Sequence, residues 1–240
     1  MQIAPAHAWS AWSAAIVILC LASACGSPPP RPATQPRPAA QAPAATTFSF
    51  DEASPGAFPA GFVARSHGPG RPAEWVVVDD PAGGRALMQR DDDDTNHRYN
   101  LALAPGSTAT DVRVAVRAQA VAGGRDRSFG VVARQRDDSY YLARCNTSDW
   151  GSNVRLYRFV QGKRTELGSA EVEARPGVWY DIALEVEGDT LRAIFAGAQV
   201  LETRDAVLAD GGACGVWTKA ESVSRFDDLV VTPLSAPVAP

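Results

Sequence analysis

The chain has few of the residues from which metal sites and common hydrolytic centres are built. Its 240 residues include 3 histidines, 4 cysteines and 2 methionines. Beyond the N-terminal segment the histidines are His67 and His97, and there is no His-x-x-His, no Gly-x-Ser-x-Gly and no cysteine pair with zinc spacing. These absences argue against zinc chemistry and against a serine nucleophile on an elbow turn.

The chain also lacks a strong charge of either sign. Lys and Arg number 23, Asp and Glu 27, and the formal net charge is -4. Electrostatics therefore gives no indication of a nucleic-acid partner or of an anionic membrane surface, because such partners attract strongly basic proteins. We expect no nucleic acid among the partners.

Helical periodicity is nearly absent from the body of the chain. The single helical candidate is a turn near residues 206–210. Short alternating segments separated by Gly, Pro and Asp predict strands at 48–50, 74–78, 86–89, 99–104, 111–121, 129–134, 140–146, 153–158, 179–187, 191–195, 199–202, 215–219 and 225–231. Many short strands with regular turns indicate an all-β sandwich or barrel. We assign it to residues 47–234, followed by a disordered tail at 235–240.

The N-terminal 25 residues have the pattern of an export signal. Residues 11–24 are mostly apolar, too short a run for a comfortable transmembrane helix, and they end in small residues. Leu21-Ala22-Ser23-Ala24-Cys25 resembles a bacterial lipobox, in which Cys25 would carry the lipid, although no Lys or Arg precedes the apolar run. The alternative is a plain signal peptide cut near Ala24, and the mass of the mature N-terminus distinguishes the two. We expect an exported protein of the cell envelope, lipid-anchored through Cys25 or else periplasmic or extracellular.

A Pro- and Ala-rich segment at 26–46 separates the signal from the body. Little of it can be buried, so it is typical of a disordered spacer with polyproline character. The alternative is a ligand for a proline-binding domain, which is less consistent with export because such domains are mostly intracellular.

Two cysteines, Cys145 and Cys214, lie in the body on expected strands. Export favours a disulfide between them, which would contribute about 4 kcal/mol by closing a long loop. Alternatively, both are small buried hydrophobic residues.

Polar and aromatic side chains share one face of the strands between 129 and 159. Successive side chains in a strand point to opposite faces, so a common face is predicted for Arg134, Arg144, Asn146, Asn153, Arg155 and Tyr157. Tyr99, Trp150, Trp217 and Lys219 are expected nearby. Guanidinium, amide and ring groups of this kind suit a sugar ligand. The alternative is an ordinary solvent-facing side of a half-exposed sheet.

The order of elements resembles that of the concanavalin A-like, or laminin G-like, jelly-roll family. More particularly, it is similar to bacterial exported domains grouped with the 3-keto-disaccharide hydrolases and loosely labelled family-16 glycoside hydrolases. The segments that carry the likeness are Ser139–Arg144, Asn153–Arg158, Gly177–Tyr180, Gly215–Ala220 and Arg225–Val230. The resemblance implies two stacked antiparallel sheets with a concave face that often holds sugar.

Acidic residues occur in patterns that the resemblance makes relevant. A family-16 glucanase carries Glu-x-Asp-x-x-Glu or Glu-x-Asp-x-Glu on one strand, whereas 171–173 and 185–187 have only Glu-Val-Glu, so family-16 chemistry is not supported. Laminin G-like domains often carry calcium, and the run Asp91–Asp94 offers carboxylates, but it lacks the spaced ligands of a calcium loop. We expect no cofactor, with calcium as the alternative.

These patterns predict a non-catalytic carbohydrate-binding β-sandwich. One alternative is a hydrolase or lyase that acts on glycosidic bonds of a modified disaccharide. Another is a structural or adhesive surface domain, which would present a contiguous apolar patch.

Overall fold

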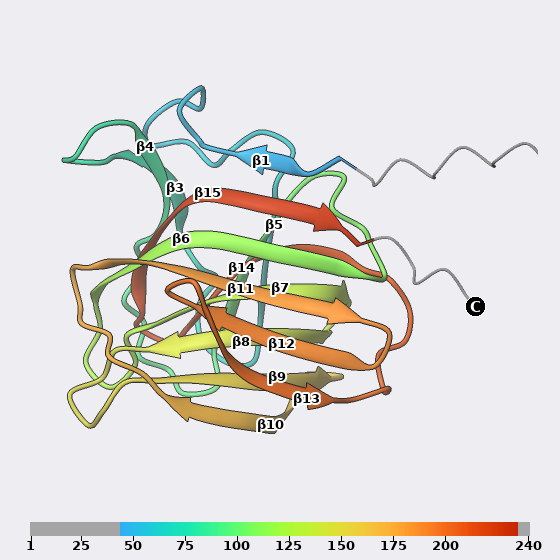
Figure 1. Ribbon diagram of the computed structural model, residues 1–240. Helices are drawn as coiled ribbons and strands as arrows, with labels where there is room; N and C mark the ends of the chain where they lie inside the picture. The colour runs from blue at the N-terminus through green and yellow to red at the C-terminus, as the bar shows by residue number, and fades with distance from the viewer. Residues whose placement is uncertain (1–43, 235–240) are drawn as a thin grey trace, which may run out of the picture. The chain divides into compact units, whose positions relative to one another are not determined.

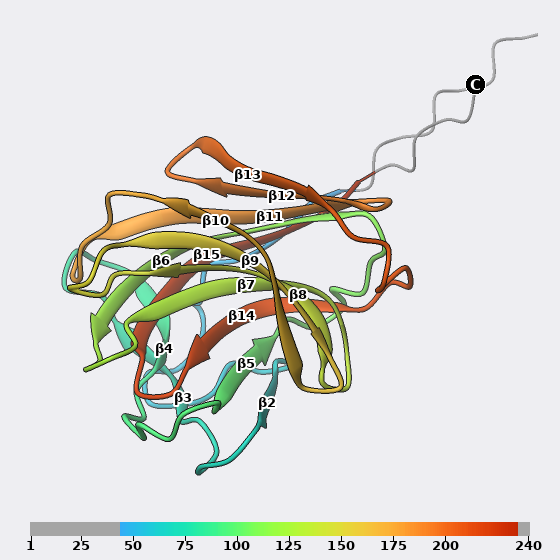
Figure 2. The same cartoon turned by 90° about the horizontal axis from the view of Figure 1, so that it is seen from below.

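Two antiparallel β-sheets lie face to face in residues 44–234, the part of the chain that the computed structural model describes (Figures 1 and 2). The expected signal at 1–25, most of the linker and the tail at 235–240 lie outside these residues. No helix within residues 44–234 is long and apolar enough to cross a membrane.

The first sheet, sheet A, has the strand order β13-β12-β11-β6-β15-β4-β3, and β1 also pairs with β15. Its strands are β1 (Thr46–Phe48), β3 (Trp75–Asp79), β4 (Arg85–Gln89), β6 (Val112–Ala122), β11 (Trp179–Glu187), β12 (Thr190–Phe195), β13 (Ala198–Arg204) and β15 (Val223–Pro233).

The second sheet, sheet B, has the order β10-β9-β8-β7-β14-β5-β2. Its strands are β2 (Val63–His67), β5 (Tyr99–Leu103), β7 (Ser128–Arg136), β8 (Ser139–Asn146), β9 (Asn153–Val160), β10 (Lys163–Glu171) and β14 (Ala213–Lys219).

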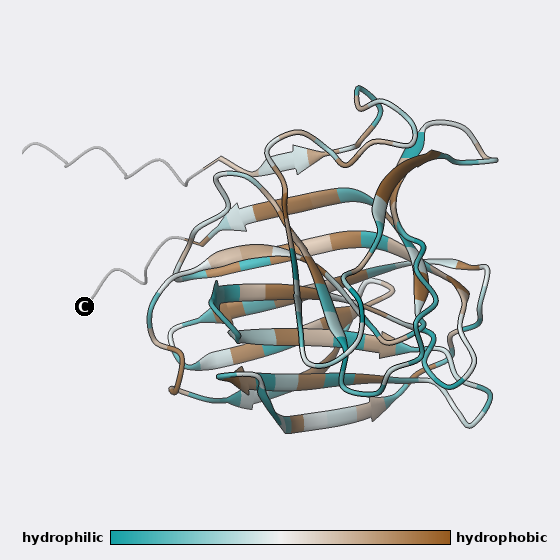
Figure 3. Ribbon diagram, turned by 180° about the vertical axis from the view of Figure 1, so that it is seen from behind, coloured by the Kyte–Doolittle hydropathy of each residue, from teal (hydrophilic) through white to brown (hydrophobic). Residues whose placement is uncertain are grey.

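The main core lies between the sheets and follows from strand alternation. In β6, buried residues alternate with half-buried ones, and Val114 faces the interior while Arg113 points outward. Leu184 of the neighbouring β11 is paired with Val114 and is also fully buried. Hydrophobic residues recur along the strands of both sheets (Figure 3). β-Branched residues fit this pleated, half-buried surface, which explains why the Val-rich segments form strands.

Sheet B carries buried apolar side chains on both of its faces. Phe129, Tyr141 and Leu156 point into the main core. A second buried set lies on the outer face, and its five rings, here called the aromatic cluster, are Tyr99, Tyr140, Tyr157, Phe159 and Trp217. The near-continuous burial of β7 and β8 therefore comes from two separate cores, one on each side of the sheet.

Burial of the aromatic cluster requires sheet B to curl around its outer face. Strands β8, β7 and β14 lie between β9 and β5, so a flat sheet would hold Phe159 of β9 and Tyr99 of β5 about 19 Å apart. Their ring centroids are only 4.9 Å apart. The outer face is consequently the inside of a curve, which is visible in Figure 2.

Two tight turns fix the end of this curve. Gln161 and Gly162 form the two-residue β9–β10 turn with φ of 49° and 75°, which matches the type I′ hairpin. The N–H of Gly162 donates to the carbonyl of Asp138 in the β7–β8 turn, at 2.8 Å. On the facing side, a Cβ on Gly68 would lie 1.9 Å from the carbonyl oxygen of His97, so this close approach requires glycine.

The predicted all-β jelly-roll sandwich is confirmed, with three local differences. Residues 206–210 form a loop without a helix. Strands β2 and β10 were not predicted, since both are exposed edge strands. β10 also carries a β-bulge between Glu166 and Gly168, which interrupts the alternation.

The expected disulfide between Cys145 and Cys214 is wrong, because both thiols are free and buried. Cys145 lies on β8 and Cys214 on β14, with β7 between them, so the strand spacing alone separates them by about 10 Å. This exceeds the reach of a disulfide. Burial raises the pKa of each thiol to about 12.

Reduction is therefore expected to leave the stability of the protein unchanged. The urea midpoint measured with and without dithiothreitol should coincide, because there is no cross-link to lose. A bridge closing this loop would instead lower the free energy of unfolding by about 4 kcal/mol on reduction. Such a drop would contradict the structure.

Candidate functional site

The outer face of sheet B brings together most of the residues that strand alternation placed on one side. Arg144 lies opposite Arg155, and Asn146 lies opposite Asn153. Tyr157 follows Arg155 on the same face. Tyr99, Trp217 and Lys219 join them from β5 and β14. The predicted grouping of these eight residues is therefore observed in the fold.

Arg134 does not belong to this face, so its predicted position is wrong. A register shift in β7 between Ala133 and Arg136 breaks the alternation, and Arg134 has a φ of 55°. Its guanidinium turns to the end of the sandwich, where it donates to the carbonyls of Thr110, Leu208 and Gly188 and pairs with Asp111 at 3.2 Å. A β-bulge re-aims a side chain in this way, and here it makes Arg134 a connector of loops.

Trp150 is not packed against the sheet face. It belongs to the β8–β9 loop, and 93% of its surface is exposed. Its neighbour Asp149 pairs with Arg127 at 2.5 Å. Its ring is therefore not packed with the other aromatic residues, and the expectation that Trp150 adjoins the site stays a prediction.

The rings of the aromatic cluster are packed against one another and not against solvent. Trp217 is fully buried and stacks on Tyr99 with ring centroids 5.9 Å apart. Its Nε1–H donates to the hydroxyl oxygen of Tyr140 at 3.2 Å, and that hydroxyl lies 2.7 Å from Nε2 of His67. Trp217 therefore forms the floor of the face, and a sugar has no access to its ring.

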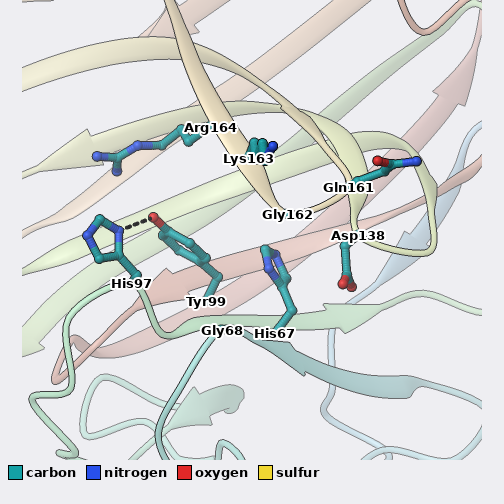
Figure 4. A pocket seen from close by; sticks show the side chains of 9 residues that line it. All are labelled: His67, Gly68, His97, Tyr99, Asp138, Gln161, Gly162, Lys163 and Arg164. Atoms are coloured by element: carbon teal, nitrogen blue, oxygen red, sulfur yellow. Dashed lines mark hydrogen bonds between the residues drawn. The ribbon is translucent and has the colours of Figure 1, made fainter.

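A hollow of about 560 Å³ opens at the curled end of this face (Figure 4). His67, Gly68, His97 and Tyr99 line one side, and Asp138, Gln161, Gly162, Lys163 and Arg164 line the other. The hydroxyl of Tyr99 is held 3.1 Å from Nδ1 of His97. The two sides come from segments far apart in the sequence, and the curl of sheet B brings them together.

Burial changes the pKa values of His67 and Tyr140 at this end of the outer face. Burial lowers the pKa of His67, and nearby Asp138 opposes that shift. The hydroxyl oxygen of Tyr140 accepts a hydrogen bond from Trp217, so the hydroxyl proton is free to be donated to Nε2 of His67. A neutral imidazole can accept this proton at Nε2, and the three side chains then form one chain of hydrogen bonds. Burial also raises the pKa of Tyr140.

The other half of the outer face is polar. Nη2 of Arg144 donates to Oδ1 of Asn153 at 2.6 Å. Arg155 pairs with Glu166 at 3.1 Å, and Lys219 pairs with Asp126 at 2.6 Å. These groups supply several donors and acceptors directly beside the aromatic floor.

Arg164 connects the polar half to the hollow. Its guanidinium carbon lies 4.8 Å from the ring centroid of Tyr157 and 6.0 Å from that of Tyr99. The guanidinium of Arg144 lies 5.7 Å from the Tyr157 ring. Cations over ring faces are attracted by the ring quadrupole, so Tyr157 interacts with two arginines.

Several carboxylates of the acidic runs noted in the sequence pair with arginines. Asp91 pairs with Arg98 at 2.7 Å and with Arg71 at 2.5 Å. Glu185 pairs with Arg113 at 2.5 Å. Within residues 44–234 no group of His, Cys, Asp and Glu side chains is arranged to hold a metal ion.

Of the residues that line the hollow, sequence reasoning assigned Tyr99 alone to the candidate site. Those from β10 and the adjoining turn escaped because the segment from Lys163 to Glu171 has an irregular polar pattern. The Gln-Gly pair at 161–162 marked a turn, and hairpin pairing across it would have placed Arg164 beside Phe159.

Comparison with known proteins places the fold. No protein-family model matches the chain, and no curated protein matches its sequence. The carbohydrate-binding module CBM66 from Bacillus subtilis superposes with a TM-score of 0.57 at 15% identity, covering 72% of this chain and 95% of that one. The carbohydrate recognition domain of Emp47p gives 0.51 at 10% identity, covering 79% and 95%. A Bacillus subtilis protein of unknown function with a galectin-like fold gives 0.51 at 10% identity, covering 72% and 90%. At these identities the likeness is one of fold, a concanavalin A-like jelly roll.

Replacing Arg134 should destabilise the domain. Arg134→Met removes the donor of three backbone carbonyls and the partner of Asp111 in a site where Arg134 is 1% exposed. We expect a loss of about 3 kcal/mol in the free energy of unfolding, measured by urea denaturation.

The neighbouring Arg136→Met is the matched control, because the side chain of Arg136 is 60% exposed. Exposed ion pairs contribute about 1 kcal/mol or less. Equal losses for the two variants would contradict the structural role of Arg134.

His67 should make stability depend on pH. The folded state resists protonation of His67, whereas the unfolded imidazole takes up a proton near pH 6.5, so this contribution is complete above pH 6.5 and is lost as the pH falls below it. Between pH 7.5 and 5.0 the wild type should lose more stability than His67→Gln. Burial raises the pKa of Asp227 to about 6, which acts in the opposite direction but equally in both proteins. If urea unfolding shows the same change of stability with pH in the wild type and in His67→Gln, this role of His67 is contradicted.

Proposed function

We propose that this protein is a non-catalytic carbohydrate-binding β-sandwich that holds a sugar on the outer face of sheet B, centred on the hollow beside Tyr99. The observation that carries the proposal is the hollow itself, in which polar side chains from β2, β5 and β10 converge over an aromatic floor. Binding sites are commonly concave surfaces with a few convergent polar groups. The folds of CBM66 and the Emp47p carbohydrate recognition domain support the proposal by analogy.

The groups around the hollow suit sugar hydroxyls. Gln161 and Asp138 offer acceptors, while Lys163 and Arg164 offer donors. His97 and the Tyr99 hydroxyl, which contact each other, can act in either direction. A sugar hydroxyl both donates and accepts, so it matches a mixed lining of this kind better than a purely acidic or purely apolar one.

The lining favours binding over hydrolysis. Glycoside hydrolysis by the common mechanisms uses two carboxyl groups that flank the scissile bond. Among the residues that line this hollow, Asp138 is the carboxylate, and the nearby acid Glu166 is paired with Arg155. A hydrolase acting on a modified disaccharide remains the second candidate, motivated by the sequence resemblance.

A contiguous apolar surface would favour the adhesive alternative instead. The large exposed hydrophobic residues of the described chain are scattered over separate elements, and they are Val63, Val121, Trp150, Val178 and Val207. Single exposed apolar residues of this kind are normal on a soluble surface. The proposal also includes export and anchoring through Cys25, which rest on the lipobox pattern alone.

Binding to an immobilised glycan panel tests the proposal. We expect the wild type to bind at least one glycan, and Gln161→Asn to bind it about threefold to tenfold more weakly, the range for one lost hydrogen bond. Asn tolerates the positive φ at this turn position, so the fold should be preserved. Reducing ends should not increase when glucans or 3-keto sugars are incubated with the protein.

Gln199→Asn on β13 is the matched control, because it makes the same change on an exposed edge of sheet A. It should bind like the wild type. Absence of binding across the panel, or equal loss in both variants, would refute the proposed site.

A further inference from the structure

The outer face of sheet B is basic although the chain as a whole is acidic. Strand pairing places five basic residues there, namely Arg65, Arg144, Arg155, Arg164 and Lys219, against the acidic residues Glu166 and Glu171, and Asp126 adds a third carboxylate by pairing with Lys219. The formal net charge of the whole chain is -4. A concave face of one sign concentrates counter-ions of the other sign, so this face attracts anions.

Arg144 differs from the other deeply buried arginines of the domain. Arg98 is 1% exposed, pairs with Asp91 at 2.7 Å and donates to several backbone carbonyls. Arg134 is equally buried and pairs with Asp111. Arg144 is 5% exposed, and within residues 44–234 it forms no ion pair. The domain therefore neutralises two of its buried guanidinium groups and leaves the third without a counter-ion.

The donors of Arg144 are also largely unused. A guanidinium carries five N–H donors. Nη2 donates to Asn153, and the buried Nε has no hydrogen-bond partner. A buried cation without a counter-ion is costly to the folded state, which is the pattern expected where an anion is supplied by a ligand. Burial, the largest effect, lowers the pKa of Arg144, and the neighbouring Arg155 adds to this shift, whereas Tyr157 and Asp126 oppose it.

Arg164 places a second cation within reach of a ligand. It is exposed, lies over the rings of Tyr157 and Tyr99, and lines the hollow. It forms no ion pair within the described residues. Arg144 and Arg164 thus both place their charge near the Tyr157 ring, and the exposed Arg164 presents a planar donor group to a ligand, a combination that suits carboxylate or sulfate oxygens.

We infer that the outer face of sheet B selects glycans that carry anionic groups, carboxylate or sulfate, with Arg164 binding the anion and Arg144 supporting it. This inference rests on the proposed carbohydrate-binding function and names its ligand class. Neutral sugars would occupy the hollow but would supply no counter-ion for the charge of Arg144.

Two matched polymer pairs test the inference on the full-length protein by isothermal titration. Polygalacturonate against its methyl ester isolates the carboxylate, and dextran sulfate against dextran isolates the sulfate. We expect at least one charged polymer to bind about tenfold or more tightly than its neutral partner, and the pair that responds identifies the anion. Added NaCl should weaken that binding, because the attraction is screened.

Substitutions of Arg164 and Arg144 test whether these side chains bind the charged polymer. Arg164→Gln should lose about tenfold in affinity for the charged polymer, Arg164→Lys should lose less, and Arg144→Gln should lose affinity while its circular dichroism spectrum is unchanged. Arg204→Gln on β13, whose side chain is 76% exposed on sheet A, is the control and should bind like the wild type. If Arg144→Gln fails to fold, the Arg164 variants still decide the matter.

The outcomes separate the inference from the proposed function. Equal binding within both polymer pairs, with glycan binding retained, overturns anion selection and leaves carbohydrate binding intact. If Arg164→Gln and Arg204→Gln lose the same affinity for the charged polymer, the attraction is nonspecific, and the inference of anion selection is overturned. Absence of binding to every glycan overturns both.

Discussion

The curl of sheet B around its aromatic cluster is the constraint on which the candidate site depends. Phe159 stacks on Tyr140 with centroids 4.4 Å apart and meets Tyr99 from across the sheet at 4.9 Å. These contacts remove ring surface from water on the side of the sheet that faces away from the main core. Without them the sheet would lie flatter, the two walls of the hollow would separate, and the outer face would resemble an ordinary exposed sheet.

The same curl determines which aromatic residues support the outer face and which reach the hollow. Trp217 and Tyr140 lie deepest and bond to each other and to His67, so they act as a support. Tyr99 reaches the hollow, and the guanidinium groups of Arg144 and Arg164 both lie over the Tyr157 ring. The chemistry available to a ligand is therefore mostly polar and cationic, although the floor that positions it is apolar.

Arginine serves two different purposes in this domain. Arg98 and Arg134 bind backbone carbonyls and a carboxylate each, and thereby tie loops to the ends of the sandwich. Arg144 is as deeply set as a structural residue, but its charge is not neutralised by the protein. The contrast lies in the partners and not in burial, so it is visible only when the contacts of each guanidinium are compared.

Strand alternation in the sequence was enough to determine the sandwich and the shared face of Arg144, Asn146, Asn153 and Arg155, because side chains in a regular strand must alternate. It was not enough for Arg134, since one bulge in β7 reverses that rule locally.

Only the tertiary structure decided that Trp217 is inaccessible, that Cys145 and Cys214 are too far apart to join, and that β2 and β10 close the hollow. These features depend on the curvature of the sheet and on which strands become neighbours. Both are set by packing between residues far apart in the chain, which a local pattern does not encode.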